Sequence, residues 1–235
     1  MKKLCIFGDS ILKGVIFSND GPKKYTLYDG ALSGKLLAEC ILAENHSHMG
    51  YTIRDGERLI EDYVNQESRL KQQTGDSVLL GFGGNDSMFN WKEVSLDPFS
   101  HHEPLTELHS FRAIYGKIVE GLIGLGFGVT LSTIVPIDPE RYLNHVSRKY
   151  DRANIIKWLG RAENLSSMHD SYNDAIVSLS RKYGLGLIDL KAVFEGNEKT
   201  LLSGDGIHPN ILGHKQIEDL VTGHFCGGVL TKSPA

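Results

Sequence analysis

The stretch LCIFGDS, residues 4–10, is a short apolar run that stops at a glycine and an aspartate. A run of this kind, bounded by turn-forming residues, predicts a buried β-strand. The same pattern returns along the chain as CILAEN from Cys40, SVLLGFGGND from Ser77, FGVTLSTIVP from Phe127 and GLGLIDL from Gly184. We therefore predict a sheet of five strands.

Segments with apolar residues at helical spacing lie between these runs. They fall near residues 59–64, 114–125 and 172–183, and a last one follows Pro209. Strands that alternate with helices indicate a parallel sheet covered on both faces. The expected fold is of the α/β class, a three-layer α/β/α sandwich around a mainly parallel five-stranded sheet. No repeat, low-complexity tract or linker divides the chain, so residues 1–235 are expected to form one domain.

The charge balance argues against a polyanionic partner. The 235 residues carry 25 Lys and Arg against 29 Asp and Glu, a formal net charge of −4, whereas nucleic-acid binding relies on clustered basic residues. No apolar stretch approaches the roughly 18 residues that cross a bilayer. The apolar run after Lys2 and Lys3 is also too short for the core of a signal peptide. We expect no nucleic-acid partner, no membrane span and a cytoplasmic location.

The cysteines and histidines do not form a recognisable metal-binding pattern. Three cysteines without a CxxC pair fit neither a disulfide framework nor a thiolate zinc site. Ten histidines are present, yet the chain lacks HExxH and any His/Cys cluster at zinc spacing. No metal and no cofactor are expected.

Two stretches, residues 87–109 and 137–167, fit the strand and helix alternation poorly. Each follows the C-terminal end of a predicted strand, where open α/β sheets bind their ligands. They are candidate substrate-binding excursions. The aromatic residues Phe89, Trp91 and Phe99 of the first one could form an acyl or sugar wall, or could anchor the loop to the body of the protein.

The motif FGDS, residues 7–10, places the hydroxyl of Ser10 directly after the first predicted strand. Taken alone it is equally typical of a turn or of a helix N-cap, because Asp and Ser both satisfy free N–H groups there. Asp9 is expected to hold this turn, with its side chain directed away from Ser10.

The motif GGND, residues 83–86, places Asn85 at the end of the third predicted strand. A glycine pair before Asn and Asp is also ordinary turn chemistry. If the first and third strands are neighbours, however, the loops after them face one another across the switch point of the sheet. The Asn85 amide would then lie close to Ser10.

The motif DGIHPN, residues 205–210, precedes the last predicted helix, and Pro209 suits the first turn of that helix. Asp205 and His208 are three residues apart, so that in a tight turn the carboxylate can accept a hydrogen bond from Nδ1–H of the imidazole. Nε2 then stays free to act as a base. A single histidine beside a proline can also be purely structural.

Together these motifs, in this order, resemble those of the SGNH (GDSL-type) hydrolase family, and the resemblance runs from FGDS to DGIHP over nearly the whole chain. GDSI stands here where the family name implies GDSL. NHSHMGYT, residues 45–52, is similar to the block that supplies a backbone N–H in this family, with Gly50 in the place of its glycine. The resemblance implies a flavodoxin-like SGNH hydrolase fold over residues 1–235.

The resemblance also implies a role for each residue. Ser10 is the nucleophile, His208 the general base, and Asp205 the acid that orients His208. The oxyanion hole consists of the N–H of Ser10, the N–H of Gly50 and the side-chain amide of Asn85. A serine hydroxyl needs an adjacent base to become nucleophilic, and donors placed where charge develops stabilise the transition state.

The expected function is hydrolysis of small O-acyl esters, such as O-acetyl carbohydrates, through an acyl-enzyme. A short acyl group is favoured because neither excursion contains a long apolar stretch. A lysophospholipase or thioesterase type of acylhydrolase is the nearest alternative. A non-catalytic ligand-binding module on the same fold is the alternative from another class, although such a module has no need of all four of Ser10, Asn85, Asp205 and His208.

Overall fold

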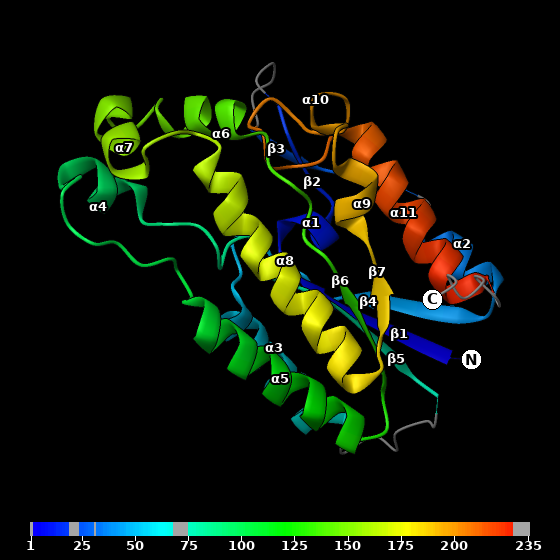
Figure 1. Ribbon diagram of the computed structural model, residues 1–235. Coiled ribbons are helices and arrows are strands. Elements are labelled where there is room, and N and C mark those ends of the chain that lie inside the picture. The colour runs from blue at the N-terminus through cyan, green and yellow to red at the C-terminus, as the bar shows by residue number, and fades with distance from the viewer. Residues whose placement is uncertain (1, 19–23, 31, 68–74, 228–235) are drawn as a thin grey trace.

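The main sheet consists of β1 (Lys2–Gly8), β4 (Ile41–Asn45), β5 (Ser77–Gly81), β6 (Gly128–Ser132) and β7 (Gly186–Ile188), shown in Figure 1. These strands belong to a computed structural model that describes residues 2–18, 24–30, 32–67 and 75–227. Each strand coincides with one of the five predicted apolar runs.

The strand order is β4-β1-β5-β6-β7, and each neighbouring pair is parallel. The chain starts in β1, runs outward to β4 and then crosses back to β5 on the other side of β1. The order of the strands therefore reverses at β1, which is the switch point where open α/β sheets bind ligands. β1 and β5 are direct neighbours, which is the condition under which Asn85 was expected to lie close to Ser10.

Helices cover both faces of the sheet. One face carries α3 (Ile53–Glu67), α5 (Leu108–Gly124) and α8 (Asn164–Tyr183), and the other carries α2 (Leu32–Ala38), α9 (Leu190–Phe194) and α11 (Ile211–Cys226). Both faces are covered because side chains along β1 point alternately to the two faces and those of residues 4–7 are all apolar. Cys5 and Phe7 pack in the core cluster under α3, α5 and α8, while Leu4 and Ile6 pack in the core cluster under α2, α9 and α11. Figure 1 shows the strands between the two sets of helices. The predicted three-layer α/β/α sandwich is confirmed.

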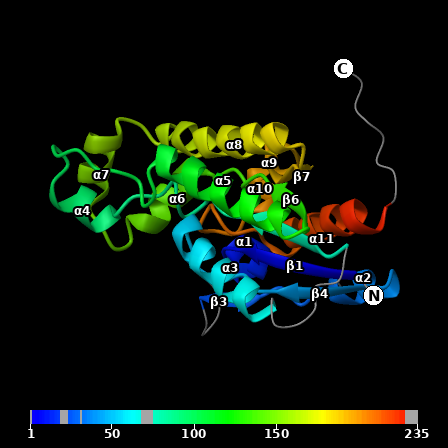
Figure 2. The same cartoon turned by 90° about the horizontal axis from the view of Figure 1, so that it is seen from below.

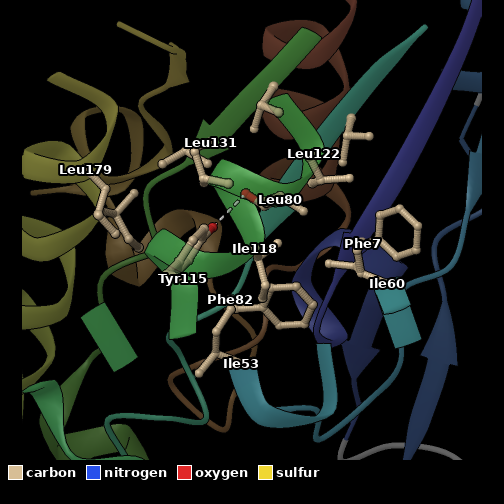
Figure 3. Close-up of a cluster of buried hydrophobic side chains, with 14 of the residues drawn as sticks. Phe7, Ile53, Ile60, Leu80, Phe82, Tyr115, Ile118, Leu122, Leu131 and Leu179 are labelled. Atoms are coloured by element: carbon tan, nitrogen blue, oxygen red, sulfur yellow. Dashed lines mark hydrogen bonds between the residues drawn. The ribbon is translucent and has the colours of Figure 1, made fainter. Parts of the chain in front are cut away.

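The larger core cluster lies under α3, α5 and α8. Figure 3 shows side chains from these helices gathered against those of β1, β5 and β6. Tyr115 of α5 is fully buried there, and its hydroxyl donates to the carbonyl of Leu80 at 3.2 Å. This hydrogen bond satisfies the one polar atom of a large buried side chain.

The two excursions form a lobe of their own beside the layers. They contain α4 (Trp91–Leu96), α6 (Pro139–Val146) and α7 (Arg152–Leu159), which lie together at one end of the molecule in Figure 2. Phe89 and Trp91 are buried in the core of this lobe, and Trp91 donates to the hydroxyl of Tyr142 at 2.8 Å. Phe99 is instead 79% exposed. The structure therefore favours the anchoring role for Phe89 and Trp91.

Several short elements were not predicted. They include α1 (Ser10–Lys13), α10 (Glu198–Leu201) and the antiparallel hairpin of β2 (Val15–Phe17) and β3 (Tyr25–Leu27). The hairpin is held to α11, because His214 donates to the carbonyl of Val15 at 2.9 Å and Tyr28 donates to Glu218 at 3.0 Å. Among the described helices, none has the length and apolarity that a membrane crossing requires.

Candidate active site

Ser10 lies at the C-terminal end of β1, at a point where two strands approach closely. Gly8 is paired with Gly81 of β5, and a Cβ added to Gly8 would lie 2.7 Å from the Gly81 carbonyl oxygen. Glycine is therefore required there. Asp9 caps α1 by accepting from the backbone N–H of Ile11 at 2.9 Å, as predicted. Ser10 is the first residue of α1, so its own N–H has no partner within the helix.

The structure brings Ser10, His208 and Asp205 together in one hydrogen-bonded chain. Nε2 of His208 lies 3.0 Å from Oγ of Ser10, and Nδ1 of His208 lies 2.7 Å from Oδ2 of Asp205. All three side chains are buried. Because a carboxylate can only accept, Nδ1 carries a hydrogen and neutral His208 keeps the lone pair of Nε2 for the Ser10 hydroxyl. This is the arrangement that a serine hydrolase needs for proton abstraction.

The turn from Asp205 to Asn210 is held rigidly. Oδ1 of Asp205 accepts from the backbone N–H of His208 at 3.2 Å, so that one carboxylate fixes both the backbone and the ring of the same histidine. Pro209 forms a bridge with Leu202, and Asn210 is the N-cap of α11. The expectation that Pro209 lies in the first turn of this helix is therefore wrong: the proline precedes the cap, because its backbone pairs with Leu202.

Asn85 follows β5 and lies across from Ser10, on the wall of the same cavity. Its Nδ2 donates to the carbonyl of Tyr51 at 2.9 Å. A carboxamide has two N–H donors, so this bond orients the group while one N–H remains for a ligand. The amide can thus act as a fixed donor toward charge that develops near Ser10.

Gly50 lies in the turn between β4 and α3, and its neighbours in this turn contact β1 and Asn85. The backbone N–H of His48, two residues earlier, donates to the carbonyl of Gly8 at 3.0 Å, and the backbone carbonyl of Tyr51, the next residue, accepts from Asn85. Gly50 has a φ of +81°, and a Cβ added there would meet nothing within 4 Å. Glycine is therefore favoured by the backbone conformation rather than by lack of space.

A cavity of about 50 Å³ is lined by Ser10, Asn85 and His208. Most of its remaining wall is apolar, and this part comprises Ile11, Leu12, Met88, Ile134, Val135, Ile137, Leu190 and Ile207. The cavity can therefore admit a small group. An acetyl group has three non-hydrogen atoms and fits this space.

Two buried carboxyl groups flank the site without belonging to the hydrogen-bonded chain. Burial raises the pKa of Asp9 to about 7, against the lowering effect of its bond from Ile11. Burial likewise raises the pKa of Asp86 to about 6, although its carboxylate accepts from the N–H of Ile53 at the start of α3. Both side chains hold backbone N–H groups, and for Asp9 this agrees with the structural role expected from the sequence.

We predict that Asp9→Asn stabilises the protein more at alkaline pH than at acidic pH. The folded protein holds the Asp9 proton up to about pH 7, while the unfolded chain loses it near pH 3.8. Stability from this group therefore falls as the pH rises between these values. Asparagine keeps the acceptor for Ile11 and cannot ionise, so we expect a gain of up to about 4 kcal/mol at pH 8, at 1.36 kcal/mol per pKa unit.

Urea unfolding at pH 5 and pH 8 measures this effect. Asp151→Asn is the matched control, because Asp151 caps α7 in the same way but is exposed. Its difference from the wild type should be the same at both pH values. An Asp9→Asn gain of equal size at pH 5 and pH 8 would show that ionisation of Asp9 does not limit stability.

One group of described residues has the composition of a metal site. Cys5, Glu44 and His46 offer ligand atoms within 4.8 Å of one another. Nζ of Lys3, however, lies 3.0 Å from Oε2 of Glu44, and Sγ of Cys5 lies 2.9 Å from the hydroxyl of Tyr63. Lysine thus supplies the positive charge that a cation would bring, so the group is better explained as an ion-paired network.

Three residues near the site were missed by the sequence analysis. The ring of Tyr25, on the unpredicted hairpin, packs edge-on to His208 with centroids 5.6 Å apart. His169 of α8 lines the cavity and lies 2.8 Å from the hydroxyl of Ser87. No local signal marks these residues, because each reaches the site only through contacts between distant segments.

Solved structures share this fold. A lipase/acylhydrolase from Enterococcus faecalis has a TM-score of 0.64 and 19% identity, with 100% of both chains covered. LAE5, an α/β hydrolase from the metagenome of Lake Arreo, has a TM-score of 0.62 and 22% identity, covering 95% of this chain and 96% of its own. Axe2, an acetylxylan esterase from Geobacillus stearothermophilus, has a TM-score of 0.60 and 21% identity, covering 99% and 97%.

The sequence comparisons assign the family. No curated protein matches this sequence. The family model described as the GDSL-like lipase/acylhydrolase family matches residues 6–216. That span runs from β1 to within α11 and includes Ser10, Gly50, Asn85, Asp205 and His208. The chain therefore belongs to the GDSL-like lipase/acylhydrolase family, which places it among the carboxylic ester hydrolases.

Proposed function

We propose that the protein hydrolyses short-chain O-acyl esters through an acyl-enzyme formed on Ser10. The observation that carries the proposal is the chain of hydrogen bonds from Ser10 Oγ to His208 Nε2 at 3.0 Å and from His208 Nδ1 to Asp205 at 2.7 Å. A serine of a helix cap has no need of a buried, oriented imidazole at its hydroxyl. A non-catalytic binding module does not explain this arrangement.

In the first half-reaction Ser10 Oγ attacks the ester carbonyl carbon while Nε2 of His208 takes the hydroxyl proton. The tetrahedral intermediate collapses when the C–O bond to the alcohol breaks, and His208 donates its proton to the leaving alcohol oxygen. Asp205 holds the imidazolium in place. A water molecule then repeats the sequence on the acyl-enzyme, and the acid and free Ser10 result.

The oxyanion formed at each addition is stabilised by the N–H of Ser10, the N–H of Gly50 and the Nδ2–H of Asn85. The free N–H at the start of α1, the turn that joins Gly50 to Asn85 through Tyr51, and the anchored carboxamide support these roles. Removal of one such donor in other hydrolases lowers kcat by about 10²- to 10³-fold. No metal ion and no organic cofactor take part in the proposed reaction.

The cavity supports an acetyl group or a similarly short acyl group as the substrate. A volume of about 50 Å³ accepts few atoms beyond the carbonyl, so long acyl chains of the lysophospholipase type are disfavoured. The neighbour Axe2 is described as an acetylxylan esterase, which is consistent with an O-acetyl carbohydrate. The exposed ring of Tyr25 beside His208 would suit the sugar side of such an ester.

Hydrolysis of p-nitrophenyl esters with two to twelve acyl carbons tests this proposal. We expect the largest kcat/KM at two to four carbons and a steep decline beyond, since longer chains exceed the cavity. Ser10→Ala should lose the activity. Ser180→Ala should retain it, because Ser180 is a buried serine near the C-terminal end of α8. A maximum at eight carbons or longer would refute the short-chain assignment, and an active Ser10→Ala variant would refute the mechanism.

We further propose that residues 1–235 form a single SGNH hydrolase domain that acts on a small-molecule ester. The family match over residues 6–216 supports this. The cytoplasmic location stays a prediction, in keeping with three cysteines that are all free. The absence of a nucleic-acid partner also stays a prediction.

A further inference from the structure

A second serine and histidine pair lies beside the proposed catalytic residues. Oγ of Ser87 is 2.8 Å from Nδ1 of His169, and both side chains are almost completely buried. The pair does not resemble a second nucleophile and base, because the other ring nitrogen of His169 faces the carbonyl of Val135 at 2.9 Å rather than a carboxylate. Because the pair is buried and lacks a carboxylate partner, we expect it to maintain a structural contact near the site.

Ser87 closes the turn that carries Asn85. Its backbone N–H donates to the carbonyl of Gly83 at 3.1 Å, and its hydroxyl lies 3.0 Å from the carbonyl of Gly84. The Gly84 carbonyl belongs to the peptide group that leads into Asn85. The side chain of Ser87 therefore restrains the peptide group that precedes Asn85.

His169 connects this turn to a rigid part of the fold. It lies on α8, a helix of 20 residues packed on the sheet. Val135 follows β6 at the same edge of the sheet and also lines the cavity. Through Ser87 and Val135 the His169 ring links the segments that follow β5 and β6, beside the cavity that contains Ser10.

The protons of the pair can be assigned from its partners. The Val135 carbonyl only accepts, so Nε2 of His169 carries a hydrogen. Burial lowers the pKa of His169, which favours the neutral ring with a lone pair on Nδ1. The single hydroxyl hydrogen of Ser87 then serves two acceptors, Nδ1 of His169 and the carbonyl of Gly84. Loss of the hydroxyl would remove both contacts, and loss of the ring would remove the contact that ties the turn to α8.

We propose that Ser87 and His169 are positioning residues, which hold the turn of residues 83–87 so that the Asn85 amide faces the oxyanion formed at Ser10. The inference rests on the oxyanion role proposed for Asn85. Catalytic donors must be placed to within fractions of an ångström, and a misplacement of about 1 Å can cost about 10²-fold in rate. The pair restrains this turn through the contacts of Ser87 with Gly84 and of His169 with Ser87 and Val135.

A double-mutant cycle on p-nitrophenyl acetate tests the inference. Ser87→Ala alone should lower kcat by roughly tenfold with KM within about twofold, because the lost interaction acts only in the transition state. Asn85→Ala alone should lower kcat by roughly 10²-fold or more. In the Asn85→Ala background Ser87→Ala should then cost less than about twofold, since no amide remains to be positioned.

A purely structural role predicts a different result. Ser87→Ala would then lower kcat by the same factor in both backgrounds, which would overturn the inference while leaving Asn85 as an oxyanion donor. An Asn85→Ala variant with wild-type kcat would overturn the oxyanion role and the inference together. Ser180→Ala is the matched control, because Ser180 is a buried serine too, and its hydroxyl donates to a backbone carbonyl, that of Leu185, at 3.1 Å.

Variants of His169 provide an independent arm of the test. His169→Asn keeps a polar atom near the position of Nδ1, whereas His169→Leu removes both ring nitrogens. We expect His169→Leu to match the kcat loss of Ser87→Ala, and His169→Asn to recover at least threefold of it. Equal activities of the two variants would contradict the inference. If His169→Leu does not fold, the Ser87 cycle decides the question.

Discussion

The variant His208→Ala should lose activity toward p-nitrophenyl acetate by about 10⁴- to 10⁶-fold, as removal of the base does in other serine hydrolases. Nε2 of His208 is the acceptor at Ser10 Oγ, and without it the hydroxyl must react at its own high pKa. The fold should persist, because alanine keeps the backbone N–H that bonds to Asp205. Circular dichroism and thermal unfolding monitor the fold.

Labelling by a fluorophosphonate probe separates loss of the nucleophile's activation from loss of substrate binding. The wild type should be labelled at Ser10, and His208→Ala should be labelled at least about 10³-fold more slowly, because the probe needs the same activated hydroxyl. His224→Ala is the control, since this histidine lies on α11 and bonds to Thr130 instead of Ser10. Near-normal labelling of His208→Ala would mean that another group acts as the base.

The sheet could be predicted from the sequence because its signal is local. LCIFG buries residues on both faces of β1, so the run is apolar throughout and ends at glycine. The hairpin with Tyr25 gave no such signal. Its strands have three residues each, and Tyr25 and Leu27 are exposed, so their pairing depends on contacts with α11 that no local pattern encodes.

The proposed catalytic residues were identifiable for a different reason. Ser10, Asn85 and His208 each follow or precede an element whose end is marked by Gly, Asp or Pro, and parallel strands bring such ends to one edge of the sheet. Ser87 and His169 carry no comparable mark. They are 82 positions apart in the chain, and a helical histidine on a buried face is indistinguishable in sequence from a core residue.

The excursions show how an interpretation changes with tertiary contacts. Phe89 and Trp91 looked equally suited to bind substrate or to anchor the chain. Both face the core that they share with Tyr142 and Leu143 of the second excursion. The two excursions thus bury each other's apolar side chains, and only the contact between them, which lies outside the reach of local periodicity, decides the role of these aromatic residues.

Asp205→Asn should lower kcat by about 10⁴-fold, the size seen when the corresponding acid of a serine protease is replaced by its amide. The Oδ1 that holds the backbone N–H of His208 is retained as the amide oxygen, so the turn should keep its conformation. An NH₂ group would replace Oδ2, which lies 2.7 Å from Nδ1 of His208. This group donates to Nδ1 and forces the hydrogen of neutral His208 onto Nε2.

Nε2–H cannot accept the Ser10 proton, so Asp205→Asn should be catalytically impaired through the tautomer of His208 and not through loss of the fold. Unfolding curves and KM should stay close to those of the wild type, while kcat falls. Asp189→Asn provides the control, because Asp189 also holds a backbone N–H, that of Ala192 at 3.1 Å, but lies at the start of α9. If Asp205→Asn retains kcat within tenfold, the carboxylate does not set the tautomer, and the proposed role of Asp205 is wrong.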